Sequence, residues 1–238
     1  MKVDIFSDVA CPWCYIGKRR FESALDAFPQ KDQVEITWHS YQLDPSAPKT
    51  SEMTLNEVLS KKYGMDIQQA VAANDRVSTL AAGEGLEYRM DIARYGNTFD
   101  AHRLIQLAGE RGLQDEVEER FFRAYFSEGE ALGDHETLVR LVSEVGIDPE
   151  EARAVLAGNE YTDAVNDDIQ NAREIGIQGV PFFILDEKYG ISGAQPTDLF
   201  KQALDQVWAE SHPKMKITTI AGNDDVACEG DSCAIPQK

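Results

Sequence analysis

The hydrophobic pattern at the start of the chain predicts a strand, a helix and a second strand. Val3–Phe6 is a short apolar run, and Val34–His39 alternate apolar and polar side chains as a half-buried strand does. The segment between them carries an apolar stripe at helical spacing, formed by Phe21, Ala24, Leu25 and Phe28. So compact a βαβ unit implies that the two strands are parallel.

Residues 55–176 are almost wholly helical in their pattern. Four amphipathic stretches have clear start or stop signals; they are Asn97–Gly112, Glu116–Gly129, Asp134–Gly146 and Asp148–Gly158. Strand character returns in Val180–Leu185 and, after a turn, in Gly190–Gly193, which together predict a hairpin. A closing helix spans Pro196–Glu210. The chain therefore begins with βαβ, ends with ββα and has a helical block between them.

This order predicts an α/β fold with a large all-helical insertion, because neither end of the chain has a complete sheet alone. We expect residues 1–50 and 177–211 to form one discontinuous domain and residues 51–176 to form the inserted helical domain. Residues 212–238 are a polar C-terminal tail.

The net charge and the length of the apolar runs limit the classes of molecule that the protein can bind. The chain has 23 basic and 42 acidic residues and a formal net charge of −19, which disfavours nucleic acid and anionic membranes. No apolar run approaches the ~18 residues of a membrane span, and the first residues are too short a run for a signal peptide. We therefore expect a cytoplasmic protein, in a compartment where stable disulfides are rare.

The sequence CPWC, residues 11–14, is the strongest chemical signal. Only four residues of the chain are cysteine, and Cys11 and Cys14 lie between the first predicted strand and the following helix. Free N–H groups and the dipole at a helix N-terminus stabilise a thiolate, so Cys11 is the expected attacking thiol. Pro12 sets the first turn, and Trp13 adds an apolar flank that faces solvent or substrate. Cys14, one turn further in, is the expected resolving thiol.

A metal site and a structural disulfide are the alternatives. Zinc needs four ligands, and the other candidate donors form no second tight pattern; they are Cys228, Cys233, His39, His102, His135 and His212. A bridge that closes so short a loop removes little chain entropy, which weakens the structural explanation. A CxxC beside a βαβ pattern is typical of a redox centre. We predict such a centre, without a metal and with the dithiol itself in place of a cofactor.

A proline at the start of the last apolar strand supports the redox interpretation. Pro181 opens the run PFFIL, where proline is normally excluded from the hydrogen-bonded ladder. An ordinary trans turn before an edge strand would explain this proline alone. Combined with CPWC and the order of elements, it favours a cis proline beside the cysteines. The backbone of Val180 would then be offered to an incoming cysteine-containing chain.

Three stretches taken together resemble a known family. SDVACPWCYIGKRRFE, GNTFDAHRL and GIQGVPFF, with the helical insertion, are similar to the DsbA-like thioredoxin superfamily and closely to its FrnE-type branch. The resemblance covers roughly residues 2–210. It implies a thioredoxin-like fold with a helical insertion, dithiol–disulfide exchange at Cys11 and Cys14, and a cis Pro181.

The resemblance extends to two classes of small-molecule enzyme. The 2-hydroxychromene-2-carboxylate isomerases and kappa-class glutathione transferases share the fold and a stretch like Asn97–His102, but carry a serine near the position of Cys11 that holds a glutathione thiolate. Their likeness implies that Asn97 and His102 line the substrate cleft. From the residues alone, a histidine on an amphipathic helix is expected to be a core or capping residue.

The sequence thus predicts an enzyme, a protein thiol–disulfide oxidoreductase or isomerase that acts on exposed cysteines of client proteins. Glutathione is a candidate reductant. A glutathione-dependent isomerase or transferase for a small aromatic substrate stays open, as does a chaperone-like module that binds unfolded chains. The sequence does not indicate an oligomeric state.

The tail carries the other two cysteines, in CEGDSC. Cys228 and Cys233 have four residues between them, with Gly230 available for a turn, and their neighbours are acidic. We predict a second dithiol that is found oxidised and accepts electrons from Cys11 and Cys14. Incidental cysteines in a disordered terminus are the alternative.

Overall fold

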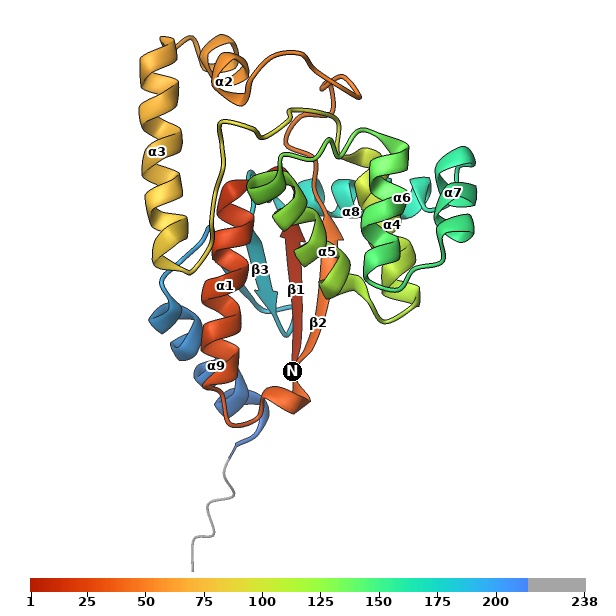
Figure 1. Ribbon diagram of the computed structural model, residues 1–238. Coiled ribbons are helices and arrows are strands. Elements are labelled where there is room, and N and C mark those ends of the chain that lie inside the picture. The colour runs from red at the N-terminus through yellow and green to blue at the C-terminus, as the bar shows by residue number, and fades with distance from the viewer. Residues whose placement is uncertain (214–238) are drawn as a thin grey trace, which may run out of the picture.

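The computed structural model describes residues 1–213, which fold around a four-stranded sheet (Figure 1). β1 (Lys2–Ser7) pairs in parallel with β2 (Glu35–Ser40). β3 (Phe182–Leu185) is antiparallel to both β1 and β4 (Tyr189–Ser192), and the strand order is β2-β1-β3-β4. Strands from both ends of the chain thus complete one mixed sheet, which confirms the α/β, thioredoxin-like fold.

Helices cover both faces of this sheet. α1 (Pro12–Asp26) and α9 (Thr197–Ser211) pack on each other over one face, where the buried core includes Val3, Ile5, Phe21, Phe183, Phe200 and Leu204. α8 (Thr162–Ile175) covers part of the other face, against Phe6 and Phe182. Side chains of β1 alternate between the two faces, so Asp4 and Phe6 lie on the α8 side.

The outer edge of β2 is covered by a side chain rather than by another strand. Gln114, the first residue of α5 (Gln114–Arg123), accepts a hydrogen bond from the Trp38 N–H and donates one to the Trp38 carbonyl, each at 3.0 Å. The amide side chain therefore imitates a neighbouring strand and protects the edge from other chains.

Before α8, the segment between β2 and β3 also contains α2 (Leu55–Tyr63), α3 (Ile67–Gly83), α4 (Phe99–Glu110), the π-helix η2 (Ala124–Glu128), α6 (His135–Glu144) and α7 (Pro149–Ala157). Between α2 and α8, the longest stretch without a helix is residues 84–98, and the other connections between helices are short. A short 3₁₀ turn, η1 (Lys31–Gln33), precedes β2. The expectation of an almost wholly helical block is wrong at residues 84–98. Leu86, Tyr88 and Met90 are buried at alternate positions, as in an extended segment.

α2 and α3 form a helical hairpin, here called the α2–α3 arm, which stands beside the N-terminal end of α1 (Figure 1). Both helices start with a capping box, from Thr54 to Glu57 and from Asp66 to Gln69. Gly64 ends α2 in the left-handed conformation (φ 65°), which glycine adopts at little cost. Local signals therefore define the arm independently of the rest of the fold.

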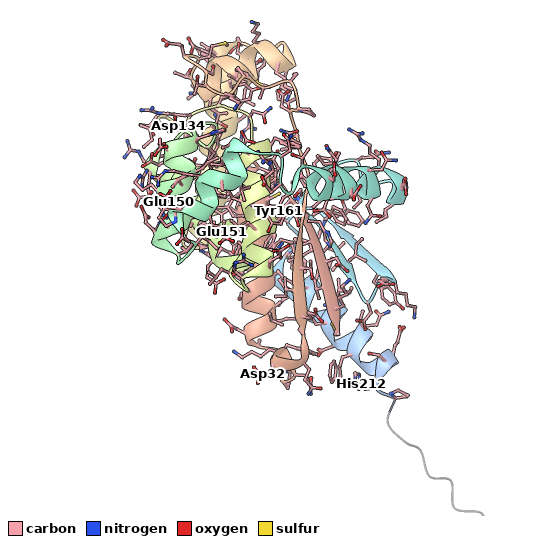
Figure 2. The ribbon with its side chains drawn as sticks, turned by 90° about the vertical axis from the view of Figure 1, so that its right-hand side faces the viewer. Asp32, Asp134, Glu150, Glu151, Tyr161 and His212 are labelled. Carbon is pink, nitrogen blue, oxygen red and sulfur yellow. The ribbon has the colours of Figure 1, made fainter. Side chains whose placement is uncertain are left out.

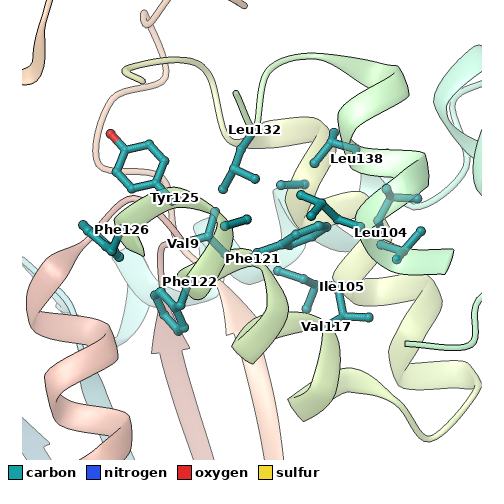
Figure 3. Close-up of a cluster of buried hydrophobic side chains, with 14 of the residues drawn as sticks. Val9, Leu104, Ile105, Val117, Phe121, Phe122, Tyr125, Phe126, Leu132 and Leu138 are labelled. Atoms are coloured by element: carbon teal, nitrogen blue, oxygen red, sulfur yellow. The ribbon is translucent and has the colours of Figure 1, made fainter. Parts of the chain in front are cut away.

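One core joins the helical layer to the N-terminal end of α1. It contains Cys14 and Tyr15 of α1 together with Phe121 and Phe122 of α5, and Figure 3 shows its centre. Acidic residues such as Asp134 and Glu150 lie on the outside of this layer (Figure 2). No helix within residues 1–213 combines the length and apolar character needed to cross a membrane.

Candidate active site

Cys11 lies at the turn that joins β1 to α1. It is the N-cap of α1 (φ −92°, ψ 113°), and its N–H donates to the Asp8 carbonyl at 2.8 Å. Pro12 follows at the first helical position, where its missing N–H costs nothing. Since no side chain among residues 1–213 caps α1, the N–H groups of its first turn remain available to the Cys11 sulfur.

The loop before β3 lies against Cys11. The Val180–Pro181 peptide bond is cis, as predicted, and the Cys11 thiol donates to the Val180 carbonyl with an Sγ···O distance of 3.5 Å. A Cβ at Gly17 of α1 would lie 2.9 Å from Pro181 Cγ, so this glycine allows the close approach of the proline ring. The structure thus brings together the dithiol and the two loop residues expected beside it.

Cys14 lies one turn into α1 and is 1% exposed. Burial, and then the hydrogen bond and charge of Cys11, raise the pKa of the Cys14 thiol well above its ordinary value. Cys11 borders a cleft, whereas Cys14 does not. Both residues are free thiols. One thiol can therefore meet a substrate while the other waits behind it in the core.

The cleft in front of Cys11 has a volume of about 510 Å³. Residues 10–13 and Val180 are among the residues that border it. The α2–α3 arm contributes an apolar wall of Leu55, Val58, Leu59, Met65, Ala73 and Val77. Tyr125 belongs to the opposite wall, and its hydroxyl points away from the hydrophobic cluster in Figure 3. The cleft is therefore mostly apolar beside one reactive thiol.

The cleft holds few charged groups. Lys62 lies 2.8 Å from Asp44, which also accepts a hydrogen bond from the Tyr95 hydroxyl at 2.6 Å. Although burial opposes it, these hydrogen bonds and one from Ser46 hold the pKa of Asp44 well below its ordinary range. Burial, and then Asp44, raise the pKa of Tyr95 to about 12. The lysine is thus already paired with a carboxylate before any ligand arrives.

Tyr88 is a site residue that the sequence analysis missed. Its hydroxyl donates to the Pro12 carbonyl at 2.8 Å, and its ring stacks on Phe126 with centroids 4.6 Å apart. Burial, and then the charge of Cys11, raise the pKa of Tyr88. Alternate burial over residues 86–90 was the available signal for an inward Tyr88, but no local pattern identifies Pro12 as its partner.

Asn97 and His102 do not line the cleft, which corrects the expectation taken from the resemblance. The Asn97 side chain accepts the Phe99 N–H at 2.9 Å and donates to the Ala47 carbonyl at 3.1 Å, so it ties a loop to the start of α4. His102 is 0% exposed. Their neighbours Gly96 and Thr98 border the cleft instead.

Two other expectations concern cysteines and metals. Cys228 and Cys233 lie outside the described residues, so their pairing stays a prediction. Within residues 1–213, no three or more His, Cys, Asp or Glu side chains are grouped so that they could hold a metal ion.

The fold and the CPWC turn define a thioredoxin-like protein with a helical insertion. The DSBA-like thioredoxin domain family matches residues 2–205, and the chain belongs to this family. A crystal structure described as a probable DsbA oxidoreductase from Streptomyces coelicolor is 46% identical, has a TM-score of 0.84 and matches over 100% of both chains. The protein YwbO of Bacillus subtilis (strain 168), uncharacterised by its name, is 29% identical over 85% of this chain and 94% of its own.

A more distant match bears on the alternative function. A solved 2-hydroxychromene-2-carboxylate isomerase has a TM-score of 0.63 and 18% identity, over 89% of this chain and 98% of the isomerase. At this identity the likeness shows the fold alone. The expected relation to these isomerases is therefore confirmed for the fold.

Proposed function

We propose that the protein is a thiol–disulfide oxidoreductase that exchanges disulfides with cysteines of other proteins. The observation that carries the proposal is the position of Cys11. It is the N-cap residue of α1, it borders the cleft, and its sulfur lies 3.5 Å from the Val180 carbonyl oxygen, while Cys14 is buried one turn further along the helix. Cys11 attacks a client disulfide, a mixed disulfide forms, and Cys14 resolves it. A slow, high-pKa Cys14 leaves time for the client to rearrange, which adds isomerase activity.

The chemistry of the cleft favours a protein client over glutathione as the molecule bound there. Glutathione carries two carboxylates, which need cationic partners. Among residues 1–213, Lys62 is the one cation that borders the cleft, and Asp44 holds it. Trp13, Leu43 and Tyr63 at the cleft are 39%, 44% and 63% exposed and fit apolar side chains of an unfolded segment. Glutathione then acts as a candidate reductant of the Cys11–Cys14 disulfide.

The decisive experiment is reduction of insulin by the purified protein with a dithiol donor, together with reactivation of scrambled ribonuclease. We expect Cys11→Ser to abolish both activities. Cys14→Ser is expected to accumulate a mixed disulfide with the client, visible on a non-reducing gel. Wild-type activity in the Cys11→Ser variant would contradict the proposal.

The two alternatives give different results in the same set of variants. Glutathione-dependent turnover of an aromatic substrate that survives Cys14→Ser would identify a small-molecule isomerase or transferase. Suppression of client aggregation that is equal in wild type and Cys11→Ser, without insulin reduction, would identify a chaperone-like binder.

The tail pair belongs to the same proposal as a second dithiol. Mass spectrometry of protein purified with its thiols blocked will show whether Cys228 and Cys233 are joined. We expect the Cys228→Ser/Cys233→Ser variant to reduce insulin at an altered rate. Free thiols together with unchanged kinetics would leave this pair without a redox role.

A further inference from the structure

The two outer edges of the sheet differ in what covers them. On β2, the side chain of Gln114 pairs with both backbone groups of Trp38. The opposite edge is β4, which pairs with β3 on one side and, among residues 1–213, with no strand on the other. Its last residue, Ser192, accepts a hydrogen bond from the Gln195 side chain at 2.8 Å. Open N–H and C=O groups along such an edge can pair with a further strand.

A pocket of about 550 Å³ opens beside this edge, on the face of the sheet that α8 covers in part. Phe182 and Ile184 of β3 and Gly190 of β4 border it. Ile175, at the end of α8, borders it as well and is 50% exposed. Side chains of a strand added to β4 would therefore meet apolar partners on this face, as cross-strand neighbours do within a sheet.

The described part of the chain ends beside the same edge. Glu210, in the last turn of α9, accepts a hydrogen bond from the Tyr189 hydroxyl at 2.7 Å and pairs with Lys188. Tyr189 is the first residue of β4, and the turn before it lies at the start of β1, where the Asp186 N–H donates to the Lys2 carbonyl at 2.8 Å. Figure 1 shows the end of α9 at this end of the sheet, near the N-terminus. The chain thus leaves the described part at the Tyr189 end of β4.

The sequence that follows contains a segment with the composition of a strand. Residues 217–220 read ITTI and lie outside the described residues. All four are β-branched, and such residues are favoured in strands. Lys214 and Lys216 precede them, while Glu187 in the turn before β4 is exposed and borders the pocket, so the charges are complementary. Residues 214–216 can span up to about 10 Å, which is twice the spacing of two neighbouring strands.

We propose that residues 217–220 bind the open edge of β4 as a fifth, parallel strand. β4 runs from Tyr189 to Ser192, so a segment that enters at the Tyr189 end and follows the edge runs in the same direction. Its N–H and C=O groups pair with those of β4, and alternate side chains pack beside the pocket. An antiparallel strand would start at the Ser192 end, about 10 Å further along, and would use the whole reach of residues 214–216.

The direction of this strand matters for the tail dithiol, a consequence that rests on the proposed function. Ser192 pairs with Phe182, the residue after Pro181, so the Ser192 end of β4 lies at the end of the sheet that carries Cys11. Cys228 follows residue 220 by eight positions, which span up to about 26 Å. Two strand spacings of about 4.8 Å separate β4 from β1. The added strand therefore directs CEGDSC toward Cys11.

Amide hydrogen exchange of the full chain, read by mass spectrometry of its peptides, tests the pairing. We expect residues 217–220 and β4 to exchange at least about tenfold more slowly in wild type than in Thr218→Pro, because proline removes a donor and fixes the backbone. Asn223→Pro, beyond the segment, is the matched control and should exchange as wild type does. Both positions lie outside residues 1–213, so neither substitution removes a contact of the described core.

Distances between spin labels test the direction. A full-length variant with all four cysteines replaced by serine carries one label at Ser192→Cys and the second at Ile220→Cys or at Lys216→Cys. A parallel strand should bring the labels at 192 and 220 closer together than those at 192 and 216, by about 10 Å. Thr218→Pro in the same background should remove this difference. The reverse order of the two distances would indicate an antiparallel strand and would overturn the proposal.

Two further results would overturn the inference. One is equal exchange in wild type, Thr218→Pro and Asn223→Pro. The other is protection of β4 that persists in Thr218→Pro together with a dimer in light scattering, which would assign the edge to a second copy of the chain. Neither measurement needs redox activity, so an inactive CPWC site would contradict the proposed function alone.

Discussion

Two histidines beside β1, the half-buried His39 and the buried His102, have opposite surroundings. His39 on β2 has both ring nitrogens paired, Nδ1 at 2.7 Å from Asp168 and Nε2 at 2.8 Å from Asp4. Within residues 1–213, His102 on α4 has neither ring nitrogen paired, and its Nε2 lies 3.6 Å from Asp8 Oδ1. A buried polar group contributes to stability when it is paired and reduces stability when it is not. The contrast separates a paired cluster that stabilises the fold from a buried histidine that has no hydrogen-bond partner within residues 1–213.

The positions of the two clusters agree with this division. The His39 cluster joins three elements through Asp4 of β1, His39 of β2 and Asp168 of α8, and Asp168 also accepts the Ser40 N–H at 2.8 Å. The His102 cluster lies at the carboxyl end of β1, the edge of an α/β sheet where ligands bind. The paired cluster thus joins two strands to α8, whereas His102 lies near the end of β1 from which the chain enters the CPWC turn.

The largest effect is expected from Asp168→Asn, which breaks the paired cluster. The carboxylate accepts from His39, from the Ser40 N–H and from Gln106 at 2.6 Å, and an amide cannot replace all three. Asp4 still pairs with His39, but the loss of these charge-assisted hydrogen bonds should lower the free energy of unfolding by about 2 kcal/mol. Asp167→Asn, at an exposed position of the same helix, should change it by less than about 0.5 kcal/mol.

Urea unfolding followed by circular dichroism measures both variants. Equal midpoints for Asp168→Asn and Asp167→Asn would mean that the pairing of His39 does not contribute to stability, and the contrast between the two histidines would fail.

A smaller effect concerns the pH dependence of stability. Burial alone would lower the pKa of His39, but the hydrogen bonds and charges of Asp168 and Asp4 outweigh it and raise the pKa above 6.5. A group whose pKa is higher in the folded state than in the unfolded state holds its proton more tightly when the protein is folded. Its contribution to stability is fully present below the pKa of the unfolded state and is lost as pH rises through the pKa of the folded state. The free energy of unfolding should therefore decrease as pH rises above 6.5.

In His39→Gln, the free energy of unfolding should no longer show the fall above pH 6.5 that His39 causes. In His212→Gln, at an exposed position, the fall should be the same as in wild type. Urea titrations at a series of pH values measure the slope for each variant. The same slope in wild type and His39→Gln would show that the charge of His39 is not linked to folding.

Local patterns were enough to predict the elements and the dithiol, because their signals lie within a few residues. The four marked helices begin and end within two residues of α4, of α5 with η2, of α6 and of α7. Cys11, Cys14 and Pro181 come together because a βαβ unit and a hairpin share one sheet, which the order of elements already implies.

Pairings between distant residues were beyond the sequence analysis. Asp168 meets His39 across 129 positions and Tyr88 meets Pro12 across 76, and neither pair shares a local pattern. The role of Asn97 was misjudged for a related reason. A family likeness places a stretch near a site, but only packing decides which of its side chains turn to the cleft, and here Gly96 and Thr98 border it.

Tyr88 is intermediate between the two histidines, because its buried hydroxyl group has one hydrogen-bond partner. Tyr88→Phe tests what that hydrogen bond contributes to stability. The change removes the 2.8 Å hydrogen bond to the Pro12 carbonyl and keeps the stacked ring, so stability should fall by about 1 kcal/mol. Tyr63→Phe, on the 63% exposed ring of α2, is the control and should be neutral. Thermal unfolding measures both. A neutral Tyr88→Phe would show that this hydrogen bond adds nothing at the CPWC turn.

The smallest effect is expected from Glu118→Gln, in the cluster that lacks partners. Its Oε2 has no hydrogen-bond partner within residues 1–213, and Lys18 keeps its ion pairs with Glu22, Asp115 and Glu119. The substitution removes no hydrogen bond at Oε2, so the free energy of unfolding at neutral pH should change by no more than about 1 kcal/mol.

The stability difference between Glu118→Gln and wild type is also expected to depend on pH. Burial, and then the charge of Asp115, raise the pKa of Glu118 well above 4.5. A carboxyl group with a raised folded pKa contributes stability that is complete below its unfolded pKa and is lost as pH rises towards the folded value. Glutamine has no proton to lose, so the stability of Glu118→Gln relative to wild type should increase as pH rises above 4.5. Glu116→Gln, exposed on the same helix, should show no such trend. A flat difference for Glu118→Gln, or a loss as large as that of Asp168→Asn, would show that Glu118 is a paired, ionised group like those around His39.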